Sequence, residues 1–499
     1  MTPLIILWLA LPFFLGLLAY LLPKGDFPLG RLGDRVLALV MTLLSGALAL
    51  GLLAAPAPLE LRLLDHFGVT LLLDTQTAWF VLTNALVTAA VVCYGWQSQK
   101  TAFFYAQVLM VHGSVNATFV CADLLSLYVA LEVLGIAAFL LIAYPRSDRS
   151  IWVGLRYLFV SNTAMLFYLV GALLVYRANN SFAFTGLTNA PYEALALLLV
   201  GLLTKGGIFI SGLWLPITHA EADTPVSALL SGVVVKAGVF PLLRFAMISE
   251  TLDPIVRGFG VATALLGVSY ALLEQDTKRV LALSTLSQMG WILAAPAVGG
   301  SYALAHGLAK SASFFIAGNL PSRQFQALRQ RLIAFPLWLG LALAGLSIAG
   351  CPPLLGFTSK ALTLKQLLPW QVWLMNLGAI GTAIVMAKFI LLPVQLPGDT
   401  SDPTRSLARQ LADRPLGFWL AIGLPLVGSI LASVLTFDPA LYGGETLLKT
   451  GVTLAIGGLI HTLVTQRGAW QAPRHWERLE QLIGMMSVLL VALFWLAWV

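Results

Sequence analysis

Charged residues are scarce in this sequence. Asp, Glu, Lys and Arg make up only 10% of its 499 residues, whereas 59% are hydrophobic. A soluble domain needs far more polar surface than this to cover its core. Together with a mean hydropathy of +0.88, the composition excludes a water-soluble fold. The backbone of such a chain is expected to be helical throughout, because lipid offers it no hydrogen-bond partners.

Cysteine is scarce as well. The three cysteines, Cys93, Cys121 and Cys351, lie in or beside apolar stretches and show no C-x-x-C spacing. Neither an iron–sulfur centre nor a disulfide framework is supported, so we interpret these thiols as packing residues. The sequence also has no G-x-G-x-x-G, P-loop or metal-spaced motif. We therefore expect no cofactor, metal site or catalytic centre on this chain.

The sequence contains instead a long series of apolar runs. A spanning helix needs roughly 20 mostly apolar residues, so the fold class is an all-α polytopic membrane protein with about 14 to 16 transmembrane helices. We interpret the first run as a span, because no A-x-A cleavage site marks it as a signal peptide. The predicted spans are residues 3–22, 36–54, 76–95, 103–121, 122–143, 152–176, 193–213, 226–246, 256–273, 280–297, 302–320, 334–366, 371–393, 416–436, 450–466 and 482–499.

Basic residues alternate with these spans. Most Lys and Arg outside the spans fall in odd-numbered loops, for example Arg35, Lys278 and Arg478. The positive-inside rule then places the basic loops in the cytoplasm and both termini outside, in a bacterial-type plasma (inner) membrane or a thylakoid membrane. Orientation and anionic lipid headgroups account for the net charge of +7, so no nucleic-acid partner is expected.

Seven basic residues remain inside predicted spans. For Arg156, Arg244 and Lys388 we expect the charged end to snorkel to the interface. Near the centre of a spanning helix, a lysine costs roughly 2.5 to 3.5 kcal/mol on the insertion scale. A cost of this size indicates a use for the other four, which are Lys205, Lys236, Lys310 and Lys360.

One carboxylate lies equally deep. Glu132 follows Asp123 by nine residues, or about 13 Å along a helix, which places Glu132 near the middle of the bilayer if Asp123 marks the interface. A protonated glutamate that is merely hydrogen-bonded within the bundle is the alternative interpretation. The interior lysines favour a charged partner role, because they offer this carboxylate opposite charges.

The spans that carry two of these lysines are irregular. Gly206 and Gly207 directly follow Lys205, and "AGCPPLLGFTSKALTL" places Pro352, Pro353 and Gly356 ahead of Lys360. Non-helical backbone at membrane depth is tolerated only where protein or water satisfies it. Interrupted spans in both halves of a chain are typical of transporters with inverted repeats, whose ion pathway lies between the repeats.

Four motifs together resemble a known family. "LPITHAEADTPVSALLSGVVVKAGVFPLLR", "TKRVLALSTLSQMG", "AHGLAKSASFFIAG" and "AGCPPLLGFTSKALT" are similar to segments of the antiporter-like subunits of respiratory complex I, energy-converting hydrogenases and Mrp-type cation/proton antiporters. The resemblance covers roughly residues 75–395. It implies two inverted five-helix repeats, each with a broken helix, at 103–246 and 256–393. An N-terminal three-helix segment would occupy 1–102, and further helices with an extra hairpin 394–499.

The resemblance also implies roles for the buried charges. Glu132 and Lys205 would form the pair whose association or separation gates proton uptake, Lys236 and Lys310 would relay protons along the membrane plane, and Lys360 would pass them out. His306 precedes Lys310 by one helical turn and is expected to join the relay. The remaining accessory residues are His219, which lies in the family's loop motif, Glu221, Asp223 and Asp123.

These roles predict a proton-translocating subunit of a multisubunit membrane complex. "SALLSGVVVKAGVF" and "RHWERLEQLIGMMSVLL" resemble the D-type subunit of Mrp Na⁺/H⁺ antiporters most. The alternative is a membrane-arm subunit of complex I, in which quinone reduction drives proton pumping. Expected partners are other membrane subunits, protons and lipids. Sodium is a candidate for the coupled ion. The whole assembly would be an enzyme in the complex I alternative and an antiporter in the Mrp alternative.

Three other classes compete with this interpretation. A stand-alone secondary transporter would also have midplane charges, but these lysines form a series along the chain rather than one pocket. A membrane-embedded enzyme would need a nucleophile motif, and isolated serines such as Ser227, Ser287 and Ser311 are more typical of helix packing. A structural subunit without transport would be expected to lose the charges first.

Overall fold

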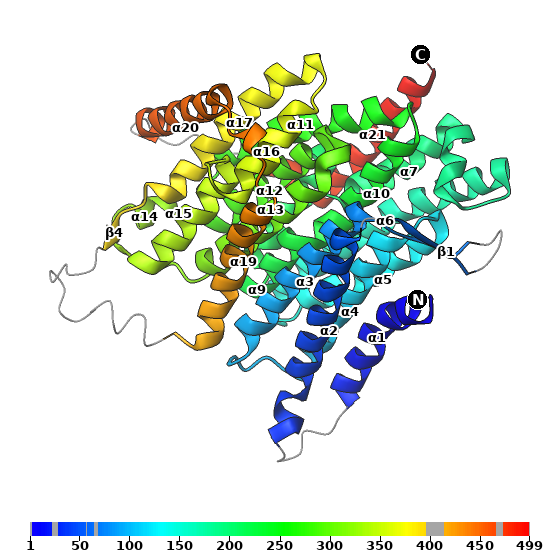
Figure 1. The fold of residues 1–499 in the computed structure, drawn as a ribbon, viewed down its shortest axis with the longest axis horizontal. Helices are drawn as coiled ribbons and strands as arrows, with labels where there is room; N and C mark the ends of the chain where they lie inside the picture. Colours follow the sequence, from blue (N-terminus) through cyan, green and yellow to red (C-terminus); the bar gives the residue numbers. More distant parts are fainter. Residues whose placement is uncertain are drawn as a thin grey trace.

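The computed structural model describes residues 2–21, 28–55, 57–63, 68–395, 414–465 and 473–498. Most of these residues are helical, which confirms the predicted all-α membrane fold (Figure 1). The N-terminal part holds three helices, and seven more elements carry the chain to residue 248. Their bounds are α1 Thr2–Leu21, α2 Pro28–Ala54, α3 Thr75–Gly95, α4 Ala102–Val120, α5 Leu124–Ile142, α6 Asp148–Asn179, α7 Tyr192–Lys205, α8 Leu215–Glu221, α9 Thr224–Leu229 and α10 Val235–Ile248.

The second part of the chain follows from residue 252. Its helices are α11 Leu252–Leu273, α12 Thr277–Ala294, α13 Gly299–Ala317, α14 Phe325–Leu328, α15 Phe335–Ala349, α16 Leu355–Lys365, α17 Pro369–Ile390, α19 Leu416–Leu435, α20 Gly444–Thr465 and α21 Leu479–Trp498. Figure 1 shows α5, α6 and α7 on one side of the molecule and α14, α15 and α17 on the other. The division into two inverted repeats stays a prediction.

By length and composition, eleven of the described helices can cross a membrane, or up to twelve if α12 and α13, joined at a bend of 110°, form one span. All sixteen predicted segments overlap a described helix. Fewer than sixteen helices pass this criterion of length and hydropathy, because some are too polar or too short. Buried Gln107, His112 and Asn116 lower the hydropathy of α4, and α15 is only 15 residues long.

Two short strand pairs occur in the described part of the chain, although helices were expected throughout. β1 (Leu59–Arg62) and β2 (Thr70–Leu73) form an antiparallel hairpin before α3, and β3 (Ile333–Ala334) pairs in parallel with β4 (Val394–Gln395). Both pairs lie in connections between spans. Strands are tolerated there because water, unlike lipid, satisfies the free edges.

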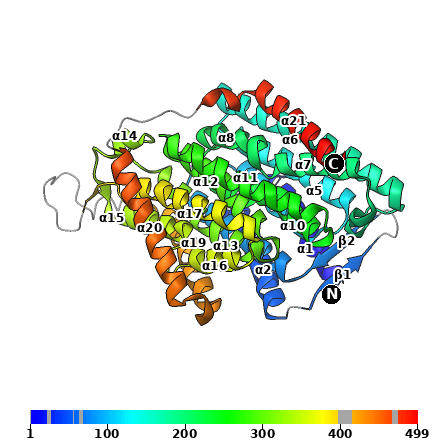
Figure 2. The ribbon, with the colours of Figure 1, turned by 90° about the horizontal axis from the view of Figure 1, so that it is seen from above.

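The two C-terminal helices pack on different partners. α20 packs against α17, whereas α21 packs against α6 and α7. Figure 2 shows α21 lying beside α6 and α7 and α20 at the other side of the molecule. The end of the chain therefore reaches back to the helices that hold Lys205.

The structure shows what holds the charged ends of Arg156, Arg244 and Lys388, whose snorkelling to the interface stays a prediction. All three are buried, and protein atoms hold their charged ends. Arg244 makes two 2.6 Å bonds to Asp74, Lys388 donates to three main-chain carbonyls at the C-terminal end of α11, and Arg156 donates to the carbonyl of Glu477. These partners come from distant segments, which is why the sequence alone did not reveal them.

We expect Asp74→Asn to destabilise the protein by about 3 kcal/mol, because it leaves the charge of Arg244 buried and unpaired. Asp74 caps α3 outside the span. Burial raises the pKa of its carboxyl, but the hydrogen bonds and charge of Arg244 outweigh this and leave the pKa below the usual 3.8. The stabilisation is therefore complete above the unfolded pKa, about 3.9, and disappears as the pH falls through the lower folded pKa.

Thermal unfolding midpoints of the purified protein across pH measure this effect. Glu445→Gln removes a fully exposed ion pair with Lys449 and serves as the control, since exposed pairs contribute little. An Asp74→Asn midpoint equal to that of the control at neutral pH would contradict the prediction.

Candidate functional site

The first broken helix ends at a buried lysine. α7 stops at Lys205, and Gly207, with a φ of 64°, turns the chain into a short 3-10 segment, Phe209–Trp214. A positive φ strains any residue with a side chain, so glycine suits this turn. The Lys205 ammonium donates a 2.6 Å hydrogen bond to the hydroxyl of Ser161 on α6. A cation at the C-terminus of a helix also meets the negative end of its dipole.

Glu132 lies beside this ammonium without touching it. Gly135, one turn further along α5, faces Lys205 so closely that a Cβ on the glycine would lie 2.8 Å from the lysine Nζ. No ion pair joins Glu132 to Lys205 in the described residues, although the two charges are within electrostatic reach. The Glu132 Oε1 is buried and has no protein hydrogen-bond partner. The structure thus holds the two residues as a separated pair.

Lys236 is completely buried. It follows a π-helical turn, Leu230–Val234, that opens the helix ahead of α10. Such turns widen the backbone and are frequent at functional sites. The ammonium donates to the carbonyls of Gly232 at 2.6 Å and Ser231 at 3.2 Å, and lies 3.1 Å from Nδ1 of His306. The contact with His306 links α10 to α13 in the middle of the protein.

Lys310, on α13, is the third member of the lysine row, which consists of Lys205, Lys236, Lys310 and Lys360 in chain order. It lies one helical turn after His306 and is also completely buried. Its ammonium donates to the hydroxyl of Ser284 at 2.5 Å and to the carbonyl of Leu281 at 3.1 Å, both on α12. The Nε2 of His306 has no protein partner. A histidine with one ring nitrogen on a lysine and the other free can pass a proton between the two sides of its ring.

The second broken helix holds Lys360. α15 ends at Ala349, Gly350 takes a φ of 90°, and α16 begins at Leu355. The Lys360 ammonium donates to the carbonyls of Ile348 and Ala349 at 3.2 and 3.1 Å and lies 5.0 Å from the ring of Trp291. The interrupted helix therefore leaves two carbonyls free for the cation.

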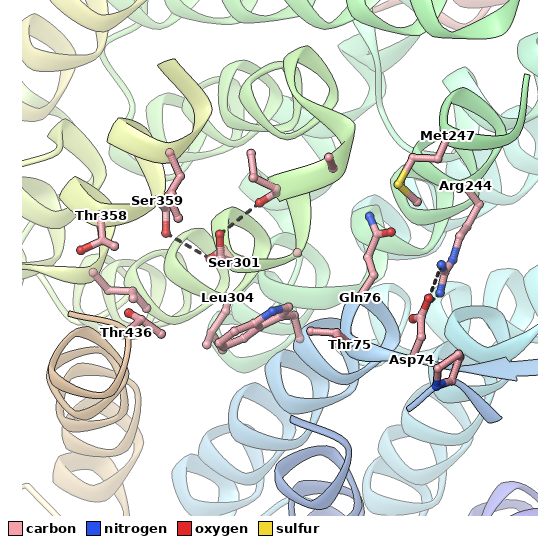
Figure 3. Close-up of a pocket in the computed structure, with 17 residues that line it drawn as sticks. Asp74, Thr75, Gln76, Arg244, Met247, Ser301, Leu304, Thr358, Ser359 and Thr436 are labelled. Atoms are coloured by element: carbon pink, nitrogen blue, oxygen red, sulfur yellow. Dashed lines mark hydrogen bonds and ion pairs between the residues drawn. The ribbon is translucent and has the colours of Figure 1, made fainter. Parts of the chain in front are cut away.

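A cavity of about 560 Å³ reaches towards this lysine. Figure 3 shows its lining, with the Asp74–Arg244 ion pair at one end and Thr358 and Ser359 of α16 at the other. The hydroxyl of Ser359 donates to the carbonyl of Ser301, while that of Thr358 is buried without a protein partner. The cavity is polar enough at this end to hold water next to the residue that precedes Lys360.

The accessory residues differ in their surroundings, because one is a buried histidine and three are carboxylates that make contacts elsewhere. His219 is buried, stacks on Phe314 of α13 at 4.8 Å, and has no protein partner at either ring nitrogen. The three carboxylates serve other contacts. Glu221 pairs with Arg149, Asp223 pairs with Lys100, and Asp123 caps α5 and accepts from the Thr70 amide. The structure thus brings both histidines near α13 but leaves these carboxylates outside the row.

Sequence reasoning missed the groups that hold the lysines. Ser161 and Ser284 accept from two of them, and Trp291 lies beside a third. Ser284 is part of the motif "TKRVLALSTLSQMG", and its place in a motif was the one available signal. Among the residues described, no group of three or more His, Cys, Asp and Glu is arranged to hold a metal.

Comparison with known proteins identifies the family. The sequence profile described as "NADH:quinone oxidoreductase/Mrp antiporter, TM" matches residues 121–386, more than half of the chain. The chain belongs to this family. The matched range begins before α5 and ends within α17, so it contains Lys205, Lys236, Lys310, Lys360 and Glu132.

Relatives within the family come from several kinds of complex. The N-type subunit of the NADH-quinone oxidoreductase of Desulforudis audaxviator is 28% identical over 432 residues, which cover 78% of this chain and 85% of the relative. The D-type subunit of the Na⁺/H⁺ antiporter of Alkalihalophilus pseudofirmus is 26% identical, over 59% and 66% of the two chains. Hydrogenase-4 component B of Escherichia coli is 30% identical, over 61% of this chain and 52% of the longer relative.

Solved structures show the same fold. A chain of the Mrp complex from Dietzia sp. DQ12-45-1b superposes with a TM-score of 0.77 at 22% identity, covering 97% of this chain and 59% of that one. A chain of the membrane-bound sulfane sulfur reductase, an archaeal respiratory membrane complex, gives 0.74 at 18% identity, covering 92% and 98%. This NADH:quinone oxidoreductase/Mrp antiporter family member is therefore an integral membrane protein with the fold of subunits from multisubunit complexes.

Proposed function

We propose that this chain moves protons as a subunit of a multisubunit membrane complex, most like the D-type subunit of an Mrp-type Na⁺/H⁺ antiporter. The supporting observation is the row of four buried lysines, Lys205, Lys236, Lys310 and Lys360, none of which bonds a carboxylate in the described structure. Their partners are hydroxyls, carbonyls and one histidine. A lysine held by neutral groups can give up its proton, which a lysine locked in a salt bridge resists.

The chemistry of lysine favours a proton-transfer role for these four positions over a fixed anion-binding role. Arginine stays charged in proteins and presents a planar fork suited to binding anions. All four central positions are lysine instead. In the proposed cycle, approach of Glu132 to Lys205 holds a proton on the lysine, and their separation releases it towards Lys236. From there it passes through His306 and Lys310 to Lys360 and the polar cavity beyond.

The proposal extends to partners and orientation. Neighbouring membrane subunits would complete the complex, with sodium as the coupled cation in an Mrp-type assembly. In a bacterial-type or thylakoid membrane, the basic loops would lie on the cytoplasmic side and both termini on the outer side. The similarity to the N-type relative over most of both chains supports one second candidate, a proton-pumping component of a membrane arm that quinone reduction drives. Proteins that copurify from the native membrane, identified by mass spectrometry, decide between the two.

Glu132→Gln tests the proposed gate. The change keeps the size of the side chain but removes its charge, so Glu132 can no longer hold a proton on Lys205. We expect proton transport by the assembled complex to fall about 100-fold, the scale of a positioned proton-transfer group. Everted membrane vesicles with a ΔpH-sensitive dye measure the rate. Sodium drives proton transport in an Mrp-type antiporter, and a quinone reductant drives it in the complex I alternative.

Glu193→Gln is the matched control, because Glu193 is exposed on the first turn of α7. We expect this variant to transport at the wild-type rate. Equal rates for Glu132→Gln and wild type, in vesicles that contain equal amounts of the assembled complex, would exclude Glu132 from the gate.

A further inference from the structure

A cavity of about 300 Å³ lies at the end of the protein predicted to face the cytoplasm, away from the lysine row. The first turns of α6, the end of α8, the chain around residues 276–279 and 323–324, and the segment before α21 form its walls. Arginine dominates the lining, with six guanidinium groups against three carboxylates. The arginines are Arg149, Arg156, Arg279, Arg323, Arg474 and Arg478.

Ion pairs within the protein neutralise part of this charge. Arg279 bonds both Glu274 and Glu477, and the remaining pairs are Arg323–Asp276, Arg149–Glu221 and Arg474–Glu274. Glu274 lies outside the lining, and its pKa reflects the pairing. Burial raises that pKa, but hydrogen bonds from Arg279 and from backbone amides outweigh burial and leave it below the usual value. The carboxylates are therefore already engaged with arginines.

Two arginines of the lining have no carboxylate partner among the described residues. Arg156 is only 5% exposed, donates to the main-chain carbonyl of Glu477, and has a buried Nε without a protein partner. Arg478, which directly follows Glu477, is exposed and makes no ion pair among the described residues. The cavity thus holds unneutralised positive charge, which fits a phosphate group.

The same cavity adjoins an apolar face. Trp152 lines it, and its ring lies within 6 Å of the guanidinium groups of both Arg149 and Arg156. Further along α6, Leu155 and Phe159 follow at helical spacing and are, like Trp152, about half exposed. An apolar stripe of this kind on a spanning helix faces lipid, and a tryptophan at its end is typical of the headgroup level.

We propose that this cavity binds the phosphate headgroup of an anionic phospholipid, with an acyl chain along the stripe on α6. The arginine excess supplies charge complementarity, and anionic lipids are concentrated in the cytoplasmic leaflet, where such basic pockets between helices bind headgroups. The headgroup bridges Arg149 and Arg156 of α6 to Arg478 before α21. It thereby fastens the C-terminal helix to α6.

The double variant Arg149→Gln/Arg478→Gln tests the site. Both side chains are exposed, so their loss leaves the buried ion pairs intact. We measure phosphatidylglycerol bound to the purified complex in nanodiscs of mixed phosphatidylglycerol and phosphatidylcholine, by native mass spectrometry. Removing two cations near a membrane surface is expected to weaken binding about 30-fold. Arg331→Gln, which removes an exposed arginine outside the cavity, should leave binding unchanged.

Two further measurements complete the test of the lipid site. Arg156→Lys keeps the charge but removes the planar fork, and we expect it to weaken binding less than the double variant does. Equal phosphatidylglycerol binding in wild type and the double variant would overturn the proposal. Inorganic phosphate that raises the unfolding midpoint in pure phosphatidylcholine nanodiscs as much as phosphatidylglycerol does would overturn the lipid as the source. Stabilisation by phosphatidylglycerol alone supports it.

Discussion

Lys236→Met is expected to reduce proton transport about 100-fold while the complex still assembles. Lys236 is completely buried and makes the direct contact with His306 that joins α10 to α13. Methionine fills nearly the same space with an unbranched apolar side chain, but it carries no proton. A relay that loses one positioned proton-transfer group loses roughly two to four orders of magnitude in rate. Initial rates of ΔpH change in everted vesicles measure the loss.

Lys365→Met is the control for this variant. Lys365 lies near the end of α16 with its ammonium close to the carbonyl of Ala440 in an exposed position, and its loss should leave the rate unchanged. Wild-type transport by Lys236→Met, at equal amounts of assembled complex, would mean that protons bypass the contact between α10 and α13.

Lys360→Arg is expected to stop transport although it preserves the positive charge. The guanidinium can still donate to the carbonyls of Ile348 and Ala349, which hold the lysine now. Arginine does not deprotonate in proteins, so it can stabilise the broken helix but cannot pass a proton on. We expect a rate about 100-fold below wild type. The same vesicle assay measures it, with the unfolding midpoint as a check on stability.

Lys388→Arg provides a close control, because Lys388 is also a buried lysine held by main-chain carbonyls. It lies outside the row, so the substitution should leave transport near the wild-type rate. If Lys360→Arg transports as well as Lys388→Arg, then Lys360 fixes the helix end and proton transfer takes another path.

Much of the fold could be predicted from the sequence. The scarcity of charge and the length of the apolar runs made a polytopic helical membrane protein unavoidable, and each of the sixteen predicted segments overlaps a helix. Gly206 and Gly207 marked the first break and Pro352, Pro353 and Gly356 the second, and the structure turns the chain there at Gly207 and Gly350, which both have a positive φ. Insertion into lipid depends on local composition, and local composition can be read along the chain.

The candidate site could be predicted only in part. The sequence singled out Lys205, Lys236, Lys310 and Lys360 because a buried cation is costly wherever its helix lies. Their order along the chain did not reveal that Ser161 and Ser284 would accept from two of them. Nor did it reveal that Lys205 would stand apart from Glu132, which depends on how α5, α6 and α7 pack.

The sequence by itself determined the class of the protein, which charges lie within apolar segments and the position of its breaks, since each depends on neighbouring residues in one segment. Only the tertiary structure decided which charges are partners. Arg244 with Asp74, Arg279 with Glu477, and the arginine-lined cavity beside α6 all join residues from different parts of the chain. Side-chain pairing depends on packing between helices, and packing is a property of the whole fold.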